Sequence, residues 1–107
     1  MQQNFYLGID VSKGYADFII LDENKKVVED NFQLDDTFDG HNKLYKILSG
    51  FLAKYPASNI LAAVESTGGY ENNWLKFLSA CQSKLQLSVA RINPFGVSYN
   101  SKATLNR

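Results

Sequence analysis

Two carboxylates, Asp10 and Glu65, stand at the ends of apolar runs, where an acidic side chain is least expected. Asp10 follows Tyr6-Leu-Gly-Ile9, and Glu65 follows Ile60-Leu-Ala-Ala-Val64. Moving an unpaired carboxylate out of water costs on the order of several kcal/mol, so such an acid is usually paired, hydrogen-bonded or bound to a cation. The two acids are far apart in sequence, so they can share a site only if the fold brings their strands together.

The chemistry that suits such a pair is metal binding. Carboxylate oxygens are the hard ligands that Mg²⁺ prefers, and a site of this kind serves phosphoryl transfer, in which two ions about 3.5–4 Å apart activate the attacking oxygen and stabilise the leaving one. Sites for two metal ions use three or four carboxylates. After Asp39 the chain contains no further aspartate, and its only later glutamates are Glu65 and Glu71, so two acids alone leave the site incomplete.

The first half of the chain has the pattern of an antiparallel meander. Aromatic and branched residues predict strands over Phe5–Ile9 and Tyr15–Leu21, joined by a turn at Val11–Gly14. A polar turn at Asp22–Lys26 leads to a third strand over Val27–Leu34, which we place at an edge of the sheet.

A helix and a buried strand follow. From Leu44 to Tyr55 apolar residues recur at helical spacing, and Pro56 ends the helix. The wholly apolar run Ile60–Val64 is typical of a central strand that is covered on both faces.

The last third of the chain repeats this alternation. A tight turn at Ser66–Gly69 leads into a second helix with Trp74 and Cys81 on its apolar stripe, and Leu85–Val89 alternates as a fifth strand. Asn93-Pro94 combines a capping residue with proline at the first helical position, which predicts a third helix from Phe95 onward.

These elements predict an α/β fold with a mixed five-stranded sheet and helices on its faces. A right-handed crossover after the third strand places the fourth strand beside the first, which gives the order 3-2-1-4-5 of a ribonuclease H-like sheet. In that order Asp10 and Glu65 end parallel neighbouring strands about 4.8 Å apart and can face a common ion.

Composition narrows the class of protein. Eleven Lys and Arg balance eleven Asp and Glu, so a nucleic-acid partner must be met by a local basic patch. Arg91, Lys102 and Arg107 lie near the expected active-site end and are the candidates for that patch. Lys13 is a candidate phosphate contact, with a plain turn role as the alternative. With one Cys and one His, neither a disulfide nor a zinc site is expected, and Cys81 is interpreted as a buried apolar residue. No signal peptide or membrane-spanning run is present, so we expect a soluble intracellular protein.

A structural role for the acids remains open on spacing alone. Asp10 can cap the turn that follows it, and Glu65 can pair with Lys13. In that case the chain is an interaction domain without catalytic activity.

Three motifs, taken in order, resemble a transposase family: Gly8-Ile-Asp-Val-Ser-Lys13, Val64-Glu-Ser-Thr-Gly-Gly-Tyr70 and Ile92-Asn-Pro94. The family is the Piv/MooV-like DEDD transposases of bacterial insertion sequences, numbered one hundred and ten. The resemblance extends from about Tyr6 to Lys102.

The resemblance implies a RuvC-like nuclease domain in which four acids bind Mg²⁺ or Mn²⁺, with Asp10 and Glu65 as the first two. The other two acids lie on the helix after the Asn-Pro motif in the family, beyond Arg107 here. The resemblance therefore implies that residues 1–107 form one domain of a longer DNA transposase, inactive alone. It also implies that the full-length protein is a homo-oligomer guided by a structured RNA. Its implied location is the cytoplasm of a prokaryote, in association with the nucleoid.

Two other enzyme classes share parts of this pattern. Half of an actin-like or sugar-kinase ATPase also opens with Gly-Ile-Asp, but Ser12 stands where its phosphate-binding hairpin has glycine, and a second similar domain would be needed. A Holliday-junction resolvase of the RuvC kind differs in where its remaining acids fall.

Overall fold

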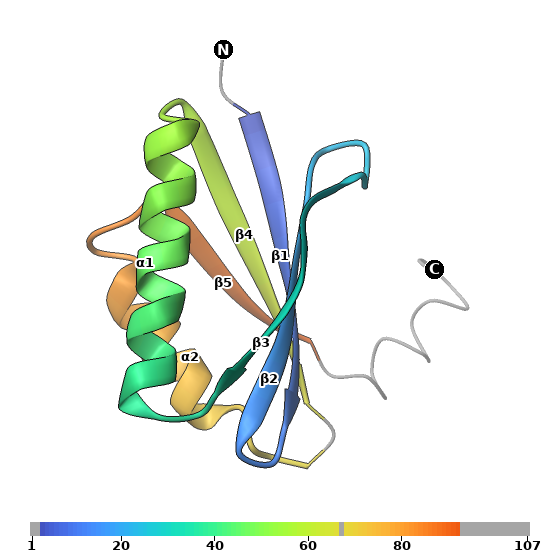
Figure 1. Ribbon diagram of the computed structural model, residues 1–107, viewed down its shortest axis with the longest axis vertical. Coiled ribbons are helices and arrows are strands. Elements are labelled where there is room, and N and C mark those ends of the chain that lie inside the picture. The colour runs from blue at the N-terminus through green and yellow to red at the C-terminus, as the bar shows by residue number, and fades with distance from the viewer. Residues whose placement is uncertain (1–2, 67, 93–107) are drawn as a thin grey trace.

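The computed structural model describes residues 3–66 and 68–92, which form a mixed five-stranded sheet and two helices (Figure 1). The strands lie in the order β3-β2-β1-β4-β5. The β1–β2 and β2–β3 pairs are antiparallel, whereas the β1–β4 and β4–β5 pairs are parallel. The predicted order is therefore confirmed. The elements are β1 (Gln3–Ser12), β2 (Tyr15–Leu21), β3 (Val27–Asp35), α1 (Phe38–Lys54), β4 (Ser58–Ser66), α2 (Asn72–Cys81) and β5 (Leu87–Ile92).

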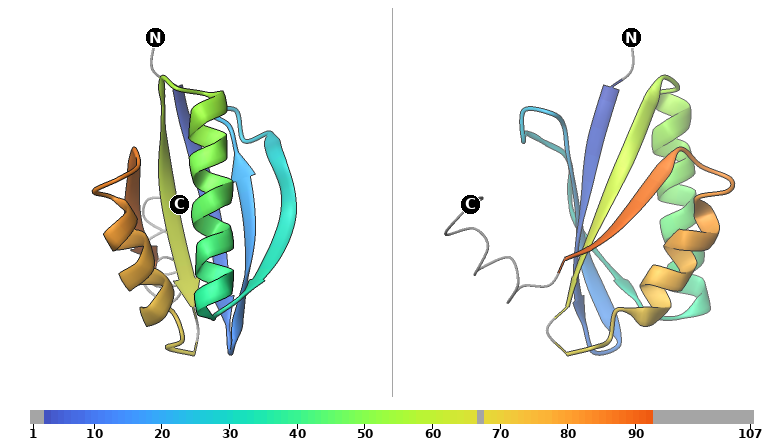
Figure 2. Two further views of the ribbon diagram at one scale, coloured as in Figure 1. Left: turned by 60° about the vertical axis from the view of Figure 1, so that its left-hand side comes forward. Right: turned by 180° about the vertical axis from the view of Figure 1, so that it is seen from behind.

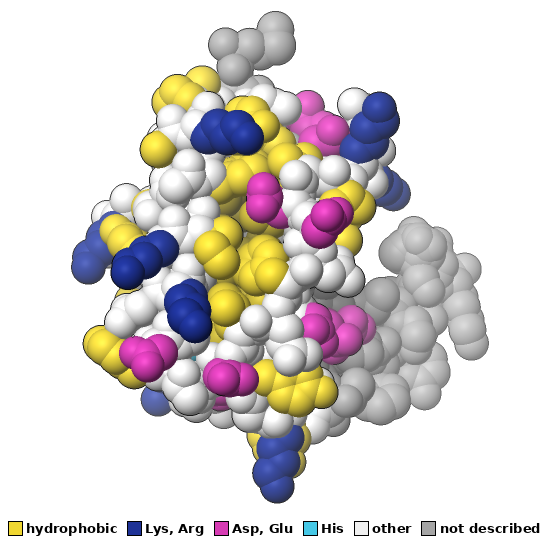
Figure 3. Space-filling view, viewed as in Figure 1, with side chains coloured by type: hydrophobic (Ala, Val, Ile, Leu, Met, Phe, Trp, Pro, Cys, Tyr) yellow, Lys and Arg dark blue, Asp and Glu magenta, His cyan; other side chains and the backbone are white. Residues whose placement is uncertain are grey.

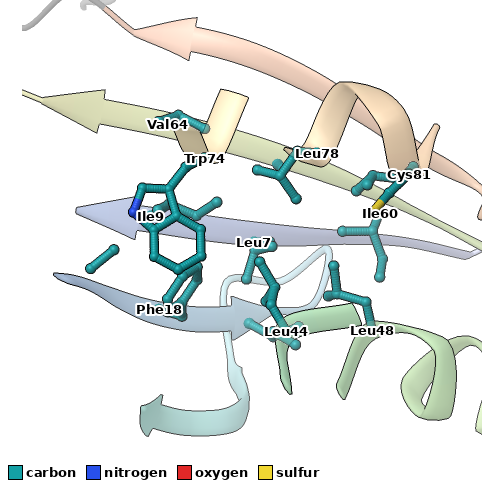
Figure 4. Packing of buried hydrophobic residues seen from close by; sticks show 14 of the residues in the cluster. Leu7, Ile9, Phe18, Leu44, Leu48, Ile60, Val64, Trp74, Leu78 and Cys81 are labelled. Atoms are coloured by element: carbon teal, nitrogen blue, oxygen red, sulfur yellow. The ribbon is translucent and has the colours of Figure 1, made fainter. Parts of the chain in front are cut away.

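Both helices cover the same face of the sheet (Figure 2). Alternate residues of the central strands point to this face and are fully buried, as strand geometry requires. Trp74 of α2 packs edge-on against Phe18 of β2, with ring centroids 5.2 Å apart. Figure 4 shows how side chains from α1, α2 and three strands meet in this core, among them Leu7, Leu44 and Leu78.

The opposite face of the sheet, which we call the open face, is not covered by any helix among the described residues. Tyr6 and Leu61 point to it and expose 39% and 40% of their surface. The prediction that the fourth strand is covered on both faces is therefore wrong for the described part of the chain. Ile60, Ala62 and Val64 of this strand are buried in the core. Leu61 and Ala63 lie on the open face and are also apolar, so the sequence of the strand is apolar throughout.

The ends of several elements differ from the predicted bounds for local reasons. Helix α1 begins at Phe38, well before the predicted start at Leu44, because the Thr37 hydroxyl accepts a hydrogen bond from the Gly40 N–H at 3.1 Å and caps the helix. Strand β5 begins at Leu87 rather than Leu85, since the Leu85 N–H donates to the Cys81 carbonyl at 2.9 Å and extends the end of α2.

The starts of α1 and α2 are joined by a polar contact around His41. Its Nε2 lies 2.8 Å from Oδ1 of Asp36, and Asn73 of α2 donates to Oδ2 of the same carboxylate at 3.2 Å. The His41 ring also packs against Trp74, with centroids 4.6 Å apart. His41 is thus used in packing, and it holds the two helices together over the core.

Three further predictions concern Cys81, membrane-spanning helices and a third helix. Cys81 is 4% exposed, as predicted, and burial raises the pKa of its thiol although Lys84 opposes the shift. Among the described residues no helix is long and apolar enough to cross a membrane. The predicted helix from Phe95 lies outside the described residues.

An apolar groove lies between α1 and the edge strand β3 (Figure 3). Ile47 and Phe51 of α1 lie in it, with Lys46 and Lys54 on the helix side and Glu29 on the strand side. This groove is on the face that carries the helices. It is therefore separate from the acidic residues of the open face.

Candidate active site

Asp10 and Glu65 are direct partners across the parallel pair of β1 and β4. Their strand neighbours Ile9, Val11 and Val64 are buried under the helices. Because side chains alternate along a strand, Asp10 and Glu65 both belong to the open face. Neighbouring strands lie about 4.8 Å apart, so the fold brings the two predicted acids together at the carboxyl ends of two parallel strands.

A third carboxylate, Asp17, stands in the same row. It is the antiparallel partner of Asp10 on β2, so Asp17, Asp10 and Glu65 follow one another across three adjacent strands. On the far side Asp17 pairs with Gln33 of β3, whose Nε2 donates to Asp17 Oδ1 at 3.1 Å. Asp17 is not among the site residues predicted from the sequence. The signal was present, since an acid inside the apolar strand Tyr15–Leu21 is as unexpected as Asp10.

The acid row borders an open groove with a volume of about 460 Å³. Gly8 and Ala63 are direct partners in the row beside the acids, and their small size leaves the groove open. A Cβ atom on Gly8 would lie 3.2 Å from Cγ2 of Ile19, so even one methyl group would begin to fill this space. The groove gives a ligand access to all three carboxylates.

Neither Asp10 nor Glu65 has a protein partner among the residues that the structure describes. No hydrogen bond or ion pair between described residues involves either acid, and the contact of His41 with Asp36 lies elsewhere, beside the start of α1. Lys13 therefore forms no pair with Glu65 in this part of the chain, and Asp10 does not cap the following turn. The carboxylate oxygens of both residues are available to a ligand.

The acids do not by themselves enclose an ion. Within residues 3–66 and 68–92, no group of three or more His, Cys, Asp or Glu side chains is arranged to hold a metal. The described part of the chain thus offers a pair of carboxylates with a third beside it.

Only two of the predicted basic residues, Lys13 and Arg91, lie in the described part of the chain. Lys13 is exposed in the turn between β1 and β2, at the same end of the sheet as Asp10. Arg91 lies in β5, where its backbone pairs with Val64 one position before Glu65. Lys102 and Arg107 lie outside the described residues, and the patch of Arg91, Lys102 and Arg107 stays a prediction.

The strand order, the parallel pairing of β1 with β4 and the acids at their carboxyl ends together define a ribonuclease H-like domain. The same fold occurs in the fowlpox virus resolvase, whose crystal structure is a complex with Holliday junction DNA. The two chains superpose with a TM-score of 0.54 and are 14% identical, over 84% of this chain and 60% of the resolvase.

Sequence identifies the family. The DEDD transposases of the IS110 type match residues 7–107. The chain therefore belongs to this transposase family, and the family that its three motifs resemble is confirmed. No curated protein matches the chain in sequence.

Two other solved structures show more distant likenesses. A Ppx/GppA family protein from Aquifex aeolicus has a TM-score of 0.48 and 14% identity, over 94% of this chain and 39% of that one. An exopolyphosphatase from Cytophaga hutchinsonii has a TM-score of 0.44 and 13% identity, over 92% and 36%. The chain thus spans 60% or less of each of these three proteins.

Proposed function

We propose that this chain is the N-terminal part of the catalytic domain of a DNA transposase, and that Asp10 and Glu65 are the first two carboxylates of its divalent metal site. The function is DNA strand cleavage and transfer, and it depends on Mg²⁺ or Mn²⁺. The observation that carries the proposal is the direct pairing of Asp10 with Glu65 on the open face of two parallel strands.

The two residues fit a divalent ion in chemistry and in access. Both present carboxylate oxygens, both border the same groove, and neither is engaged by a described residue. Mg²⁺ in proteins keeps several water molecules and is bound through one or two carboxylates together with substrate phosphates. Two free carboxylates beside an open groove meet that requirement.

The residues of the chain have separate parts in this reaction. Asp10 and Glu65 would hold the ion, which when bound supplies Lewis-acid activation of a phosphodiester. Gly8 and Ala63 leave room for the DNA backbone next to the acids. Lys13, in the exposed turn at the same end of the sheet, would contact a phosphate and position the strand.

DNA is the proposed partner for two reasons. The family is one of transposases, and the fowlpox resolvase with the same fold is seen bound to Holliday junction DNA. The remaining two acids of the family are proposed to lie beyond Arg107, with Lys102 and Arg107 as further contacts to DNA. A guide RNA and a homo-oligomeric state belong to the full-length protein in this proposal.

Titration with Mn²⁺ tests the metal site. Paramagnetic Mn²⁺ broadens the amide NMR signals of nearby residues, so weak binding can be measured and located. We expect broadening centred on β1 and β4 near Asp10 and Glu65. The variants Asp10→Asn and Glu65→Gln should each reduce the apparent affinity about 10-fold or more.

The control variant is Asp39→Asn, which removes one negative charge from an exposed position of α1. It should bind Mn²⁺ like the unaltered chain. If Asp10→Asn and Glu65→Gln also leave the titration unchanged while the fold is intact, the two acids are not metal ligands and the proposal is wrong.

A further inference from the structure

Asp17 stands next to the proposed ligand pair with a fixed orientation. Its antiparallel partner is Asp10, and its other neighbour in the row, Gln33, donates to its Oδ1 at 3.1 Å. Asp17 also borders the same groove as Asp10 and Glu65. Its second carboxylate oxygen has no partner among the described residues.

Without a bound cation, the row of Asp17, Asp10 and Glu65 lowers the stability of the fold. Directly opposite residues in an antiparallel pair have Cβ atoms about 4.5–5.5 Å apart, and like charges in such positions are destabilising. Asp10 has a carboxylate neighbour on each side, and no described cation is paired with any of the three. A divalent ion at Asp10 and Glu65 would offset the repulsion along the whole row.

Direct coordination by all three acids does not fit the structure. No group of three acidic side chains among the described residues is arranged around a common point. An ion bound by one or two carboxylates retains water molecules, and neighbouring carboxylates that accept hydrogen bonds from such water tune the affinity of metal sites. Asp17 has the position and the free oxygen for that second role.

We infer that Asp17 is a positioning residue of the metal site, and that its free carboxylate oxygen holds the hydration shell of a divalent ion bound by Asp10 and Glu65. Gln33 fixes the orientation of Asp17 through the other oxygen. This inference rests on the proposed function and adds to it a residue outside the four family acids.

Substitution of Asp17 tests the inference, with Mn²⁺ affinity as the readout. Asp17→Asn keeps the oxygen that accepts from Gln33 but removes the charge, so the local structure should survive. We expect the apparent affinity for Mn²⁺ to fall roughly 10-fold, the lower end of the loss on removing an outer carboxylate. Asp17→Glu, which retains the charge, should recover most of the affinity.

Two comparisons separate this inference from a structural role and from the proposed function. Urea unfolding of Asp17→Asn without metal should show no loss of stability. If Asp17→Asn binds Mn²⁺ as the control Asp39→Asn does, while Asp10→Asn and Glu65→Gln bind weakly, the inference about Asp17 is wrong and the site itself stands. If none of these variants changes the affinity, the proposed function fails and the inference fails with it.

Discussion

Asp10 lies between two other carboxylates without any described partner to neutralise it. Such a position lowers stability, because like charges oppose each other across adjacent strands. Residues that serve function are often those that a protein keeps at a cost in stability. The surroundings of Asp10 therefore favour the ligand role over the structural one.

The same reasoning predicts the effect of Asp10→Asn on the metal-free chain. The substitution removes repulsion and breaks no hydrogen bond or ion pair of the described residues. It should leave the free energy of unfolding unchanged or raise it by about 0.2–1 kcal/mol, with the gain declining at high salt. Urea unfolding at low and high ionic strength measures this. A loss of more than about 1 kcal/mol would show that Asp10 has a structural role.

The position of Asp17 beside Asp10 could not be predicted from the sequence. Asp10 and Glu65 could be selected because each ends an apolar run, and both prove to be register partners. The turn was predicted at Val11–Gly14, whereas the strands continue until Ser12 pairs with Tyr15. A small error in the turn changes every partner across the hairpin, so the pairing of Asp10 with Asp17 could not be deduced.

Helix α1 offers a matched pair of glycines that tests the packing of an element. A Cβ atom at Gly40 would collide with the backbone carbonyl of Asp35, whereas one at Gly50 meets nothing within 4 Å. Gly40→Ala should therefore destabilise the chain by at least about 3 kcal/mol, since the obstacle is backbone and cannot move aside.

Gly50→Ala is the control for this prediction. It should stabilise the chain by about 0.5–1 kcal/mol, because alanine favours a helix interior over glycine. Thermal or urea unfolding of both variants measures the difference. If Gly40→Ala is tolerated as well as Gly50→Ala, the junction of β3 and α1 is not packed as the structure has it.

The helices, the strands and the order of the strands could largely be predicted. The exact starts of α1 and β5, and the number of faces on which β4 is buried, could not. Strand order followed from two antiparallel hairpins and one right-handed crossover, and it is confirmed. The polar capping by Thr37 and the bond from Leu85 to Cys81, which set the ends of α1 and β5, have no apolar signature. Burial of β4 on one face only was missed because Leu61 and Ala63 are apolar even though they lie on the open face.

The molecule as a whole has its core on one face of the sheet and the row of Asp17, Asp10 and Glu65 on the other. The helices stabilise the domain from one side, and the groove beside Asp10 remains accessible from the other. This separation lets the acid row vary without loss of the core. We therefore expect substitutions of Asp10, Glu65 and Asp17 to leave the core intact.

We expect the 107 residues alone not to cleave DNA. The described part of the chain supplies a ligand pair and one neighbouring carboxylate, and no group of three arranged to hold an ion, whereas two-metal phosphoryl transfer needs a fuller set. Incubation with supercoiled plasmid and Mg²⁺ or Mn²⁺ should give no nicking above that of Asp10→Ala. Nicking that Asp10→Ala abolishes would show that the acids present suffice.

The central claim is that Asp10 and Glu65 bind one divalent ion between β1 and β4. Crystals of the chain soaked in Mn²⁺ test it directly, because the anomalous scattering of manganese locates the ion without reference to the surrounding atoms. We expect an anomalous peak within coordinating distance of both carboxylates, about 2.0–2.1 Å for an ion of the size of Mg²⁺ and slightly more for Mn²⁺. A well-ordered acid row with no peak, or a peak bound only by other residues, would contradict it.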